Sequence, residues 1–174
     1  MLPDDWGRIG AIEVSKNGNC AAVWIAYDRD TDTIHVYDSC LFRNEVWPVI
    51  AEGLNARGRK VPVAWKKEDK SFADELLARG CNLTYDSVDE NAATTEVVAR
   101  TIWERMRSGR FKVEKRLSEW RDEYKTFQRT GAKIPIETHP LMAATRHAVA
   151  SMEYAKAKAV VKTKQTTYPQ IAVI

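Results

Sequence analysis

The feature that most constrains the fold is an Asn-Gly pair between two apolar runs near the start of the chain. The runs are residues 8–15 and 20–28, and the four residues between them read KNGN. An Asn-Gly pair in this setting is a strong β-hairpin signal, because both residues tolerate the positive φ of a tight turn. A third run, residues 33–41, follows the polar segment RDTD. The sequence therefore predicts three antiparallel strands in a meander.

Helical and extended patterns alternate after the meander. Apolar positions at helical spacing predict a helix over residues 46–55, and residues 60–65 (KVPVAW) return to a strand. Residues 71–79 form the next predicted helix, with Ser71 as its N-cap, and residues 81–85 are predicted as a fifth short strand. This order is typical of a βαβ-type crossover.

The second half of the chain has mostly helical patterns. Apolar stripes predict a long helix over residues 91–107, another over 117–127 and a last one from 140 to about 158, with a brief extended piece at 110–113. Residues 159–174 are expected to be a polar tail. The whole predicts an α/β fold with a mixed sheet of about five strands, the Glu13 strand central, and helices on both faces.

Composition favours a single folded domain. With 174 residues, 44% of them hydrophobic and 29% charged, the chain can bury a core without disulfides. Its three cysteines show no CxxC spacing, which indicates neither a zinc site nor a disulfide framework. No stretch reaches the roughly 18 apolar residues of a membrane span. A cytoplasmic protein is expected.

Positive charge gathers in two places, although the net charge is only +3. Residues 105–116 read RMRSGRFKVEKR and residues 154–165 read YAKAKAVVKTKQ. Either segment can follow a phosphate backbone, but a solvated helix face and a solubilising tail would look the same. The candidates for DNA contact in the first segment are Arg105, Arg107, Arg110 and Lys112.

Several stretches, taken in order, resemble the C-terminal nuclease domain of phage terminase large subunits. They read RIGAIEVS, IHVYDSCLFRNEVWPVIAEGLNARGRKVPVAW, DELLARGCNL, RMRSGRFKV and HPLMAATRHAVASM, and they span roughly residues 6–152. The resemblance implies a ribonuclease H-like nuclease domain over residues 1–158, followed by the tail. The chain has no GxxxxGK[ST] motif, so the resemblance does not extend to the ATPase half of a terminase, and an excised domain is expected.

The resemblance also implies a function. Such domains are metal-dependent endonucleases that cut concatemeric double-stranded DNA in the host cytoplasm, with two Mg²⁺ or Mn²⁺ ions held by carboxylates. The implied partners are double-stranded DNA, the terminase ATPase domain, the small terminase subunit and the portal protein. The carboxylates should come from a central strand, from the end of a crossover strand and from the start of the last helix.

Glu13 fits the first of these places, because it is the one acid inside the apolar run RIGAIEVS. A charge there is costly to bury unless it is paired or bound to a metal. Family members often have aspartate here, which is one methylene shorter. The alternative is a glutamate on the open face of an edge strand.

Glu68 and Asp69 are the acids available at the second place, after KVPVAW. Asp69 matches the family's pattern better, but Lys66 and Lys67 stand where the family often has a polar or acidic residue. Two lysines would compete electrostatically with a metal cation. The alternative is a solvated loop leading into a helix N-terminus, where acids are favourable.

His139 occupies the third place, where the family usually has one or two aspartates before LM-x-ATRYA. A histidine ligand would shift the preference from Mg²⁺ towards Mn²⁺, because Mg²⁺ prefers oxygen. The alternative is a helix-capping histidine without a metal, and Glu137 is a nearby substitute. Arg146, as a phosphate contact, and His147 could face the same cleft from the last helix.

Three further acids, Asp86, Asp89 and Glu90, could add a carboxylate or form only a turn and helix cap. Three hypotheses therefore remain open. The first is the metal-dependent endonuclease, with Glu13, Asp69 and His139 as catalytic residues and Glu68 as an additional metal ligand. The second is a catalytically degraded nuclease-fold module that binds DNA or the portal without cutting. The third is an unrelated α/β protein.

Overall fold

The computed structural model describes residues 2–157, apart from 16–18, 90, 129–130 and 132–133. Its centre is a five-stranded mixed sheet in the order β4-β1-β2-β3-β5. The first three strands form the predicted antiparallel meander, and the two short edge strands pair in parallel with it. The strands are β1 (Gly7–Val14), β2 (Cys20–Asp28), β3 (Thr33–Phe42), β4 (Val63–Ala64) and β5 (Phe111–Val113).

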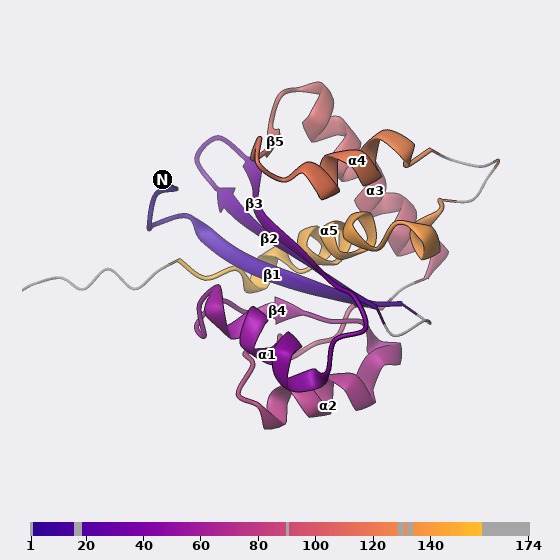
Figure 1. Cartoon of the computed structure of the whole chain (residues 1–174). Coiled ribbons are helices and arrows are strands. Elements are labelled where there is room, and N and C mark those ends of the chain that lie inside the picture. The colour runs from indigo at the N-terminus through magenta and orange to yellow at the C-terminus, as the bar shows by residue number, and fades with distance from the viewer. Residues whose placement is uncertain (1, 16–18, 90, 129–130, 132–133, 158–174) are drawn as a thin grey trace, which may run out of the picture.

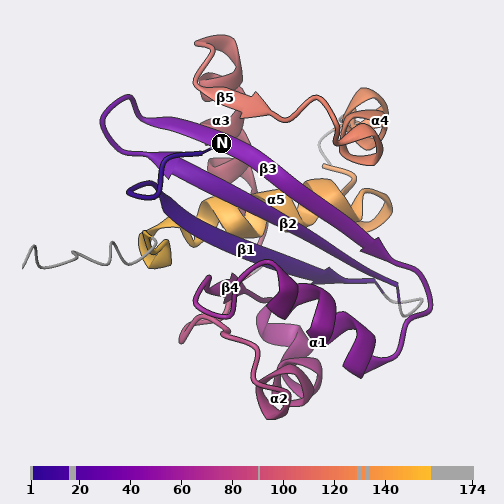
Figure 2. The same ribbon diagram turned by 60° about the vertical axis from the view of Figure 1, so that its left-hand side comes forward.

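Helices cover both faces of the sheet, as predicted (Figures 1 and 2). One face is covered by α1 (Trp47–Ala56) and α2 (Lys70–Ala78). The other face is covered by α5 (Pro140–Ala150), with α3 (Ala92–Arg107) and α4 (Ser118–Thr126) beside it. Three single turns of 3₁₀ helix are Lys67–Asp69, Ile136–Thr138 and Met152–Tyr154.

Because both faces are covered, the inner strands have apolar side chains on both sides. Ile9 and Ala11 of β1 belong to the core under α5, whereas Ile12 belongs to the core under α1 and α2. The same alternation continues in β2, where Val23 and Trp24 point to opposite faces. This double burial explains why the strands read as nearly continuous apolar runs. Strand β1 has β4 on one side and β2 on the other, so the Glu13 strand lies inside the sheet, as predicted, although the middle strand is β2.

The fifth strand is not where the sequence predicted it. Residues 81–85 form only an isolated bridge, Leu83 with Val63, and β5 comes instead from the brief extended piece after α3. The chain bends after this bridge, where the Thr84 hydroxyl donates to the carbonyl of Asp86, and it returns only for a second isolated bridge, Val88 with Lys66. Helix α2 also starts one residue early, at Lys70, with Asp69 and not Ser71 at its N-cap.

The last helix is shorter than predicted. It ends at Ala150, and the chain then returns to the sheet, where Lys156 exchanges two backbone hydrogen bonds of 2.9 and 3.1 Å with Arg8. This pairing with the start of β1 satisfies backbone groups that a longer helix would have used internally. The predicted helix end at 158 and the predicted tail, residues 159–174, lie outside the described residues.

Candidate functional site

The candidate site is built around Glu13, near the carboxyl end of β1. Ile9 and Ala11 face α5, so Glu13, two residues further on, faces α5 as well and is only 8% exposed. Strand β4 runs parallel to β1 with Ala64 beside Ala11. Two residues further along each of these two segments, Lys66 lies beside Glu13. Its ammonium donates to Glu13 Oε1 at 2.9 Å.

The second oxygen of Glu13 is also occupied. His147 projects from α5, is completely buried, and its Nε2 lies 2.8 Å from Glu13 Oε2. Burial acts to raise the pKa of Glu13, but the hydrogen bonds and charges of His147 and Lys66 outweigh it and hold the pKa below its usual value. Glu13 is therefore an ionised carboxylate with partners on both oxygens.

Asp69 is the second acid of the site. Its Oδ2 lies 3.9 Å from the Lys66 ammonium, so the lysine stands between two carboxylates. Burial, with a further contribution from the charge of Glu13, raises the pKa of Asp69 to about 6 despite the opposing charge of Lys66. Burial and the same two acids raise the pKa of Cys20 to about 12, so this neighbouring thiol stays protonated.

An open cavity of about 940 Å³ lies next to these residues. Glu13 and Lys66 line it on the side of the sheet. On the opposite side, Glu123 lines it from α4, and Glu137 lines it from the segment that leads into α5. Glu137, considered as a substitute ligand, is thus placed on the cavity. The 3₁₀ turn Ile136–Thr138 forms that part of the wall.

His139 makes its described contacts away from Glu13. Its Nδ1 lies 2.9 Å from the carbonyl oxygen of Pro135, its Nε2 lies 3.2 Å from the Thr126 hydroxyl, and its ring packs edge-on against Phe127. The residue stands at the N-cap of α5, without a side-chain hydrogen bond to the helix backbone. It is His147, one of the two residues considered for this cleft on the last helix, that brings an imidazole to Glu13.

The donor set does not fit a divalent ion as it stands. Within the described part of the chain, no three His, Cys, Asp or Glu side chains are grouped so that they could hold a metal. The space between Glu13 and Asp69, where an ion would need oxygen ligands, contains the Lys66 ammonium. Glu68 is exposed on the 3₁₀ turn before α2.

The four DNA-binding residues predicted in the segment 105–116 lie at the other end of the sheet. Glu13 is level with Ala21 in the β1–β2 pairing, whereas the turn between β2 and β3 lies beyond Tyr27, which pairs with Gly7. Two of the basic residues, Arg105 and Arg110, bind Asp32 in that turn, and the Arg107 guanidinium lies over the ring of Trp103. Arg107 and Lys112 are the exposed ones.

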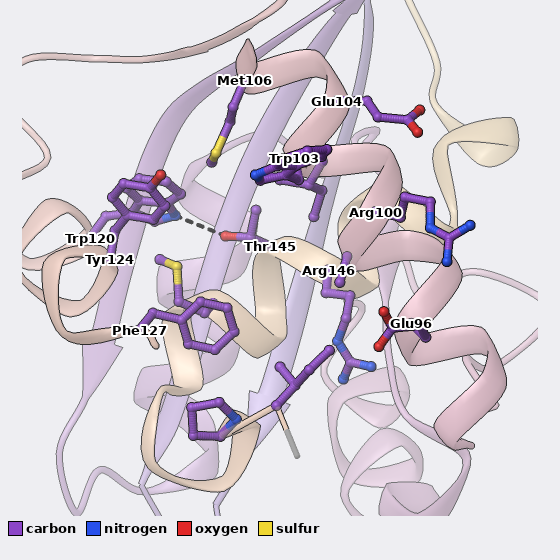
Figure 3. A pocket seen from close by; sticks show the side chains of 15 residues that line it. Glu96, Arg100, Trp103, Glu104, Met106, Trp120, Tyr124, Phe127, Thr145 and Arg146 are labelled. Atoms are coloured by element: carbon purple, nitrogen blue, oxygen red, sulfur yellow. Dashed lines mark hydrogen bonds between the residues drawn. The ribbon is translucent and has the colours of Figure 1, made fainter. Parts of the chain in front are cut away.

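Arg146 projects into a second cavity, of about 500 Å³, between α3, α4 and α5 (Figure 3). It is 6% exposed, and its guanidinium donates to the Thr95 hydroxyl. The opposite wall carries Trp120 and Tyr124, and Trp120 donates to the Thr145 hydroxyl at 2.8 Å. In this position Arg146 connects α5 to α3.

The remaining acids have structural partners. Asp86 accepts a hydrogen bond from the Tyr154 hydroxyl, and the carbonyl of Asp89 accepts one from Thr94 in the first turn of α3. Glu90 lies outside the described residues.

The sequence indicates Lys66 only as a competitor for a metal. Its position against Glu13 could have been found by extending the parallel pairing of the two predicted strands, residues 8–15 and 60–65. Among the described residues, no helix is long and apolar enough to cross a membrane.

Comparison with known proteins finds matches only among solved structures. No family model matches the sequence, and no curated protein does. The P22 large terminase nuclease domain superimposes with a TM-score of 0.82 at 18% identity, covering 91% of this chain and 87% of that one. The SPP1 large terminase nuclease domain, solved with bound Mn, has a TM-score of 0.66 at 12% identity and coverages of 83% and 84%.

The HK97 large terminase matches with a TM-score of 0.65 at 11% identity. The match covers 86% of this chain but only 40% of that larger protein. The domain described here thus corresponds in fold to one part of a terminase large subunit, and it has the fold of the large terminase nuclease domains.

Proposed function

We propose that this chain serves as the nuclease domain of a viral DNA-packaging terminase and acts on double-stranded DNA. The observation that carries the proposal is the buried Glu13 on the wall of an open cavity, with the half-buried Asp69 on the other side of Lys66, in a fold shared with terminase nuclease domains over most of the chain. A domain of this fold forms only part of the HK97 large terminase, so the rest of such a subunit, the ATPase domain, is a proposed partner. The small terminase subunit and the portal protein are further partners implied by the resemblance to phage terminases.

A second candidate function is DNA binding without cutting. This candidate is favoured by the ion pairs of Lys66 with Glu13 and Asp69, because a metal ion would need the same two carboxylates as ligands. Under both candidates Glu13 and Asp69 are the acids of the site. Under the first candidate alone, His139, at the start of α5, is a candidate ligand if the segment before that helix rearranges. The two candidates differ in whether a divalent cation, Mg²⁺ or Mn²⁺, enters the site when DNA is bound.

Cutting is tested by nicking of supercoiled plasmid with Mg²⁺ or Mn²⁺. If the domain is an endonuclease, nicking should need a divalent ion, and it should be faster with Mn²⁺ if His147, whose Nε2 lies beside Glu13, becomes a ligand, because the harder Mg²⁺ prefers oxygen ligands. Glu13→Gln, which keeps the side-chain shape, should then abolish nicking. Nicking by Glu13→Gln at the wild-type rate would exclude Glu13 from the chemistry. An absence of nicking with either ion would favour the second candidate.

DNA binding itself is tested through its dependence on salt. Replacing Arg107 and Lys112 with alanine should weaken binding to duplex DNA, because both are exposed on the predicted basic surface. Each phosphate contact contributes ~0.9 to the slope of log K against log salt concentration, so losing two contacts should make the slope shallower by ~1.8. Fluorescence anisotropy of a labelled duplex at several salt concentrations measures this slope.

The matched control removes the same charge elsewhere. Arg59 and Lys60 are exposed just before β4, the strand at the opposite edge of the sheet from β5. Alanine at both positions should leave the slope at the wild-type value. If the two double variants behave alike, the basic surface around Arg107 and Lys112 is not the one that contacts DNA.

A further inference from the structure

The two acids of the site, Glu13 and Asp69, are already paired with the ammonium group of Lys66. The Lys66 ammonium lies 2.9 Å from Glu13 Oε1 and 3.9 Å from Asp69 Oδ2, and the side chain is 13% exposed. A charge so deeply placed needs close partners, because burying an unpaired ammonium is costly. The lysine and the two carboxylates therefore stabilise one another, and any other cation has to displace the lysine.

The backbone fixes Lys66 in this place. Its Cα follows β4, whose parallel pairing with β1 sets it level with Glu13, and Lys66 forms an isolated bridge with Val88 on the other side. The amide of Lys67 donates to the Val88 carbonyl, and that of Asp69 to the Lys66 carbonyl. The side chain thus enters the site from a segment with backbone hydrogen bonds on both flanks.

We propose that Lys66 is a built-in competitor for divalent cations, which occupies the place between Glu13 and Asp69 and sets how weakly the site binds a metal. An ion entering there must break the Lys66–Glu13 contact and must also bear the repulsion of a nearby ammonium. At about 4 Å this repulsion between like charges is large even near a protein surface. Removing the lysine charge should increase metal affinity.

The neighbouring lysine provides a matched control. Lys67 carries the same charge on the next residue, but it is exposed, whereas Lys66 is largely buried. A general effect of net charge on cation binding would respond equally to both lysines. An effect of the occupied place between Glu13 and Asp69 responds only to Lys66.

The test measures binding of Mn²⁺ alone, without DNA, to the wild type, Lys66→Gln and Lys67→Gln. The electron paramagnetic resonance signal of free Mn²⁺ gives the bound fraction, and thermal melting with and without Mn²⁺ gives a second measure. We expect Lys66→Gln to bind Mn²⁺ at least about tenfold more tightly than the wild type and to be stabilised by it. Lys67→Gln should match the wild type. Equal affinity of Lys66→Gln and the wild type, or an equal gain in Lys67→Gln, would overturn the proposal.

A measurement on the wild type alone covers the case in which Lys66→Gln fails to fold. Bound Mn²⁺ broadens the NMR signals of nearby nuclei, so a site at Glu13 would show first in the backbone amides of Glu13 and Cys20. We expect no selective broadening of these signals at micromolar Mn²⁺ in the wild type, and its appearance would overturn the proposal. The inference rests on the proposed function only because that function assigns a metal ion to this site. If Lys66→Gln fails to bind Mn²⁺ more tightly, the role of Lys66 is wrong, whereas the proposed DNA binding is tested by its salt dependence and is not affected.

Discussion

Replacing Glu13 with alanine is expected to lower the free energy of unfolding by about 3–5 kcal/mol, because it takes the closest counter-charge from a largely buried ammonium and a hydrogen-bond partner from a buried imidazole. Lys66 and His147 both point at this carboxylate, and His147 is completely buried. The loss comes mainly from the ammonium, which loses its 2.9 Å contact with Glu13 and lies 3.9 Å from Asp69. Chemical denaturation of the purified domain measures the change.

Two further variants show whether pairing is the cause. Glu137→Ala removes an exposed acid from the wall of the same cavity and should change the free energy of unfolding by no more than about 0.5 kcal/mol. Adding Lys66→Met to Glu13→Ala should recover part of the lost stability, since it removes the charge that has lost Glu13 but keeps an apolar chain of similar length. If the double variant is no more stable than Glu13→Ala, the buried pair is not what stabilises this region.

Trp120→Ala is expected to lower the free energy of unfolding by about 3–5 kcal/mol as well, through a cavity in the core under α5. Trp120 is 2% exposed and belongs to that core. Its ring stacks against Tyr124 at 5.5 Å and against Phe111 at 6.2 Å, and its indole nitrogen donates to Thr145. Truncation removes these contacts and enlarges the adjacent cavity that Figure 3 shows.

Trp103 is the natural control, since it lines the same cavity from α3 but is 53% exposed. Trp103→Ala should cost less than about 1 kcal/mol, most of it from the contact with Arg107. Thermal melting of both variants makes the comparison. Equal losses would mean that α3, and not the buried contact of α4 with α5, limits the stability of this side of the domain.

Local patterns were sufficient for most of the fold. The meander followed from three apolar runs and one Asn-Gly turn, and the helices over residues 46–55, 91–107 and 117–127 followed from their apolar stripes. These signals are local, because side-chain alternation and helical spacing arise from the geometry of each element. The signals failed where pairing is not local. The short edge strand β5 exists only because β3 offers it a partner, and residues 81–85, with a stronger strand pattern, leave the sheet after one bridge.

That an acid lies in a buried interior strand follows from the apolar run around it, and this was enough to select Glu13. The sequence could not determine what that acid contacts. Lys66 is 53 residues away and His147 is 134 residues away, and both reach Glu13 only because β4 pairs beside β1 and α5 crosses the same face. Charge pairing in a site depends on distances of a few ångströms between elements, and only the tertiary structure sets those distances.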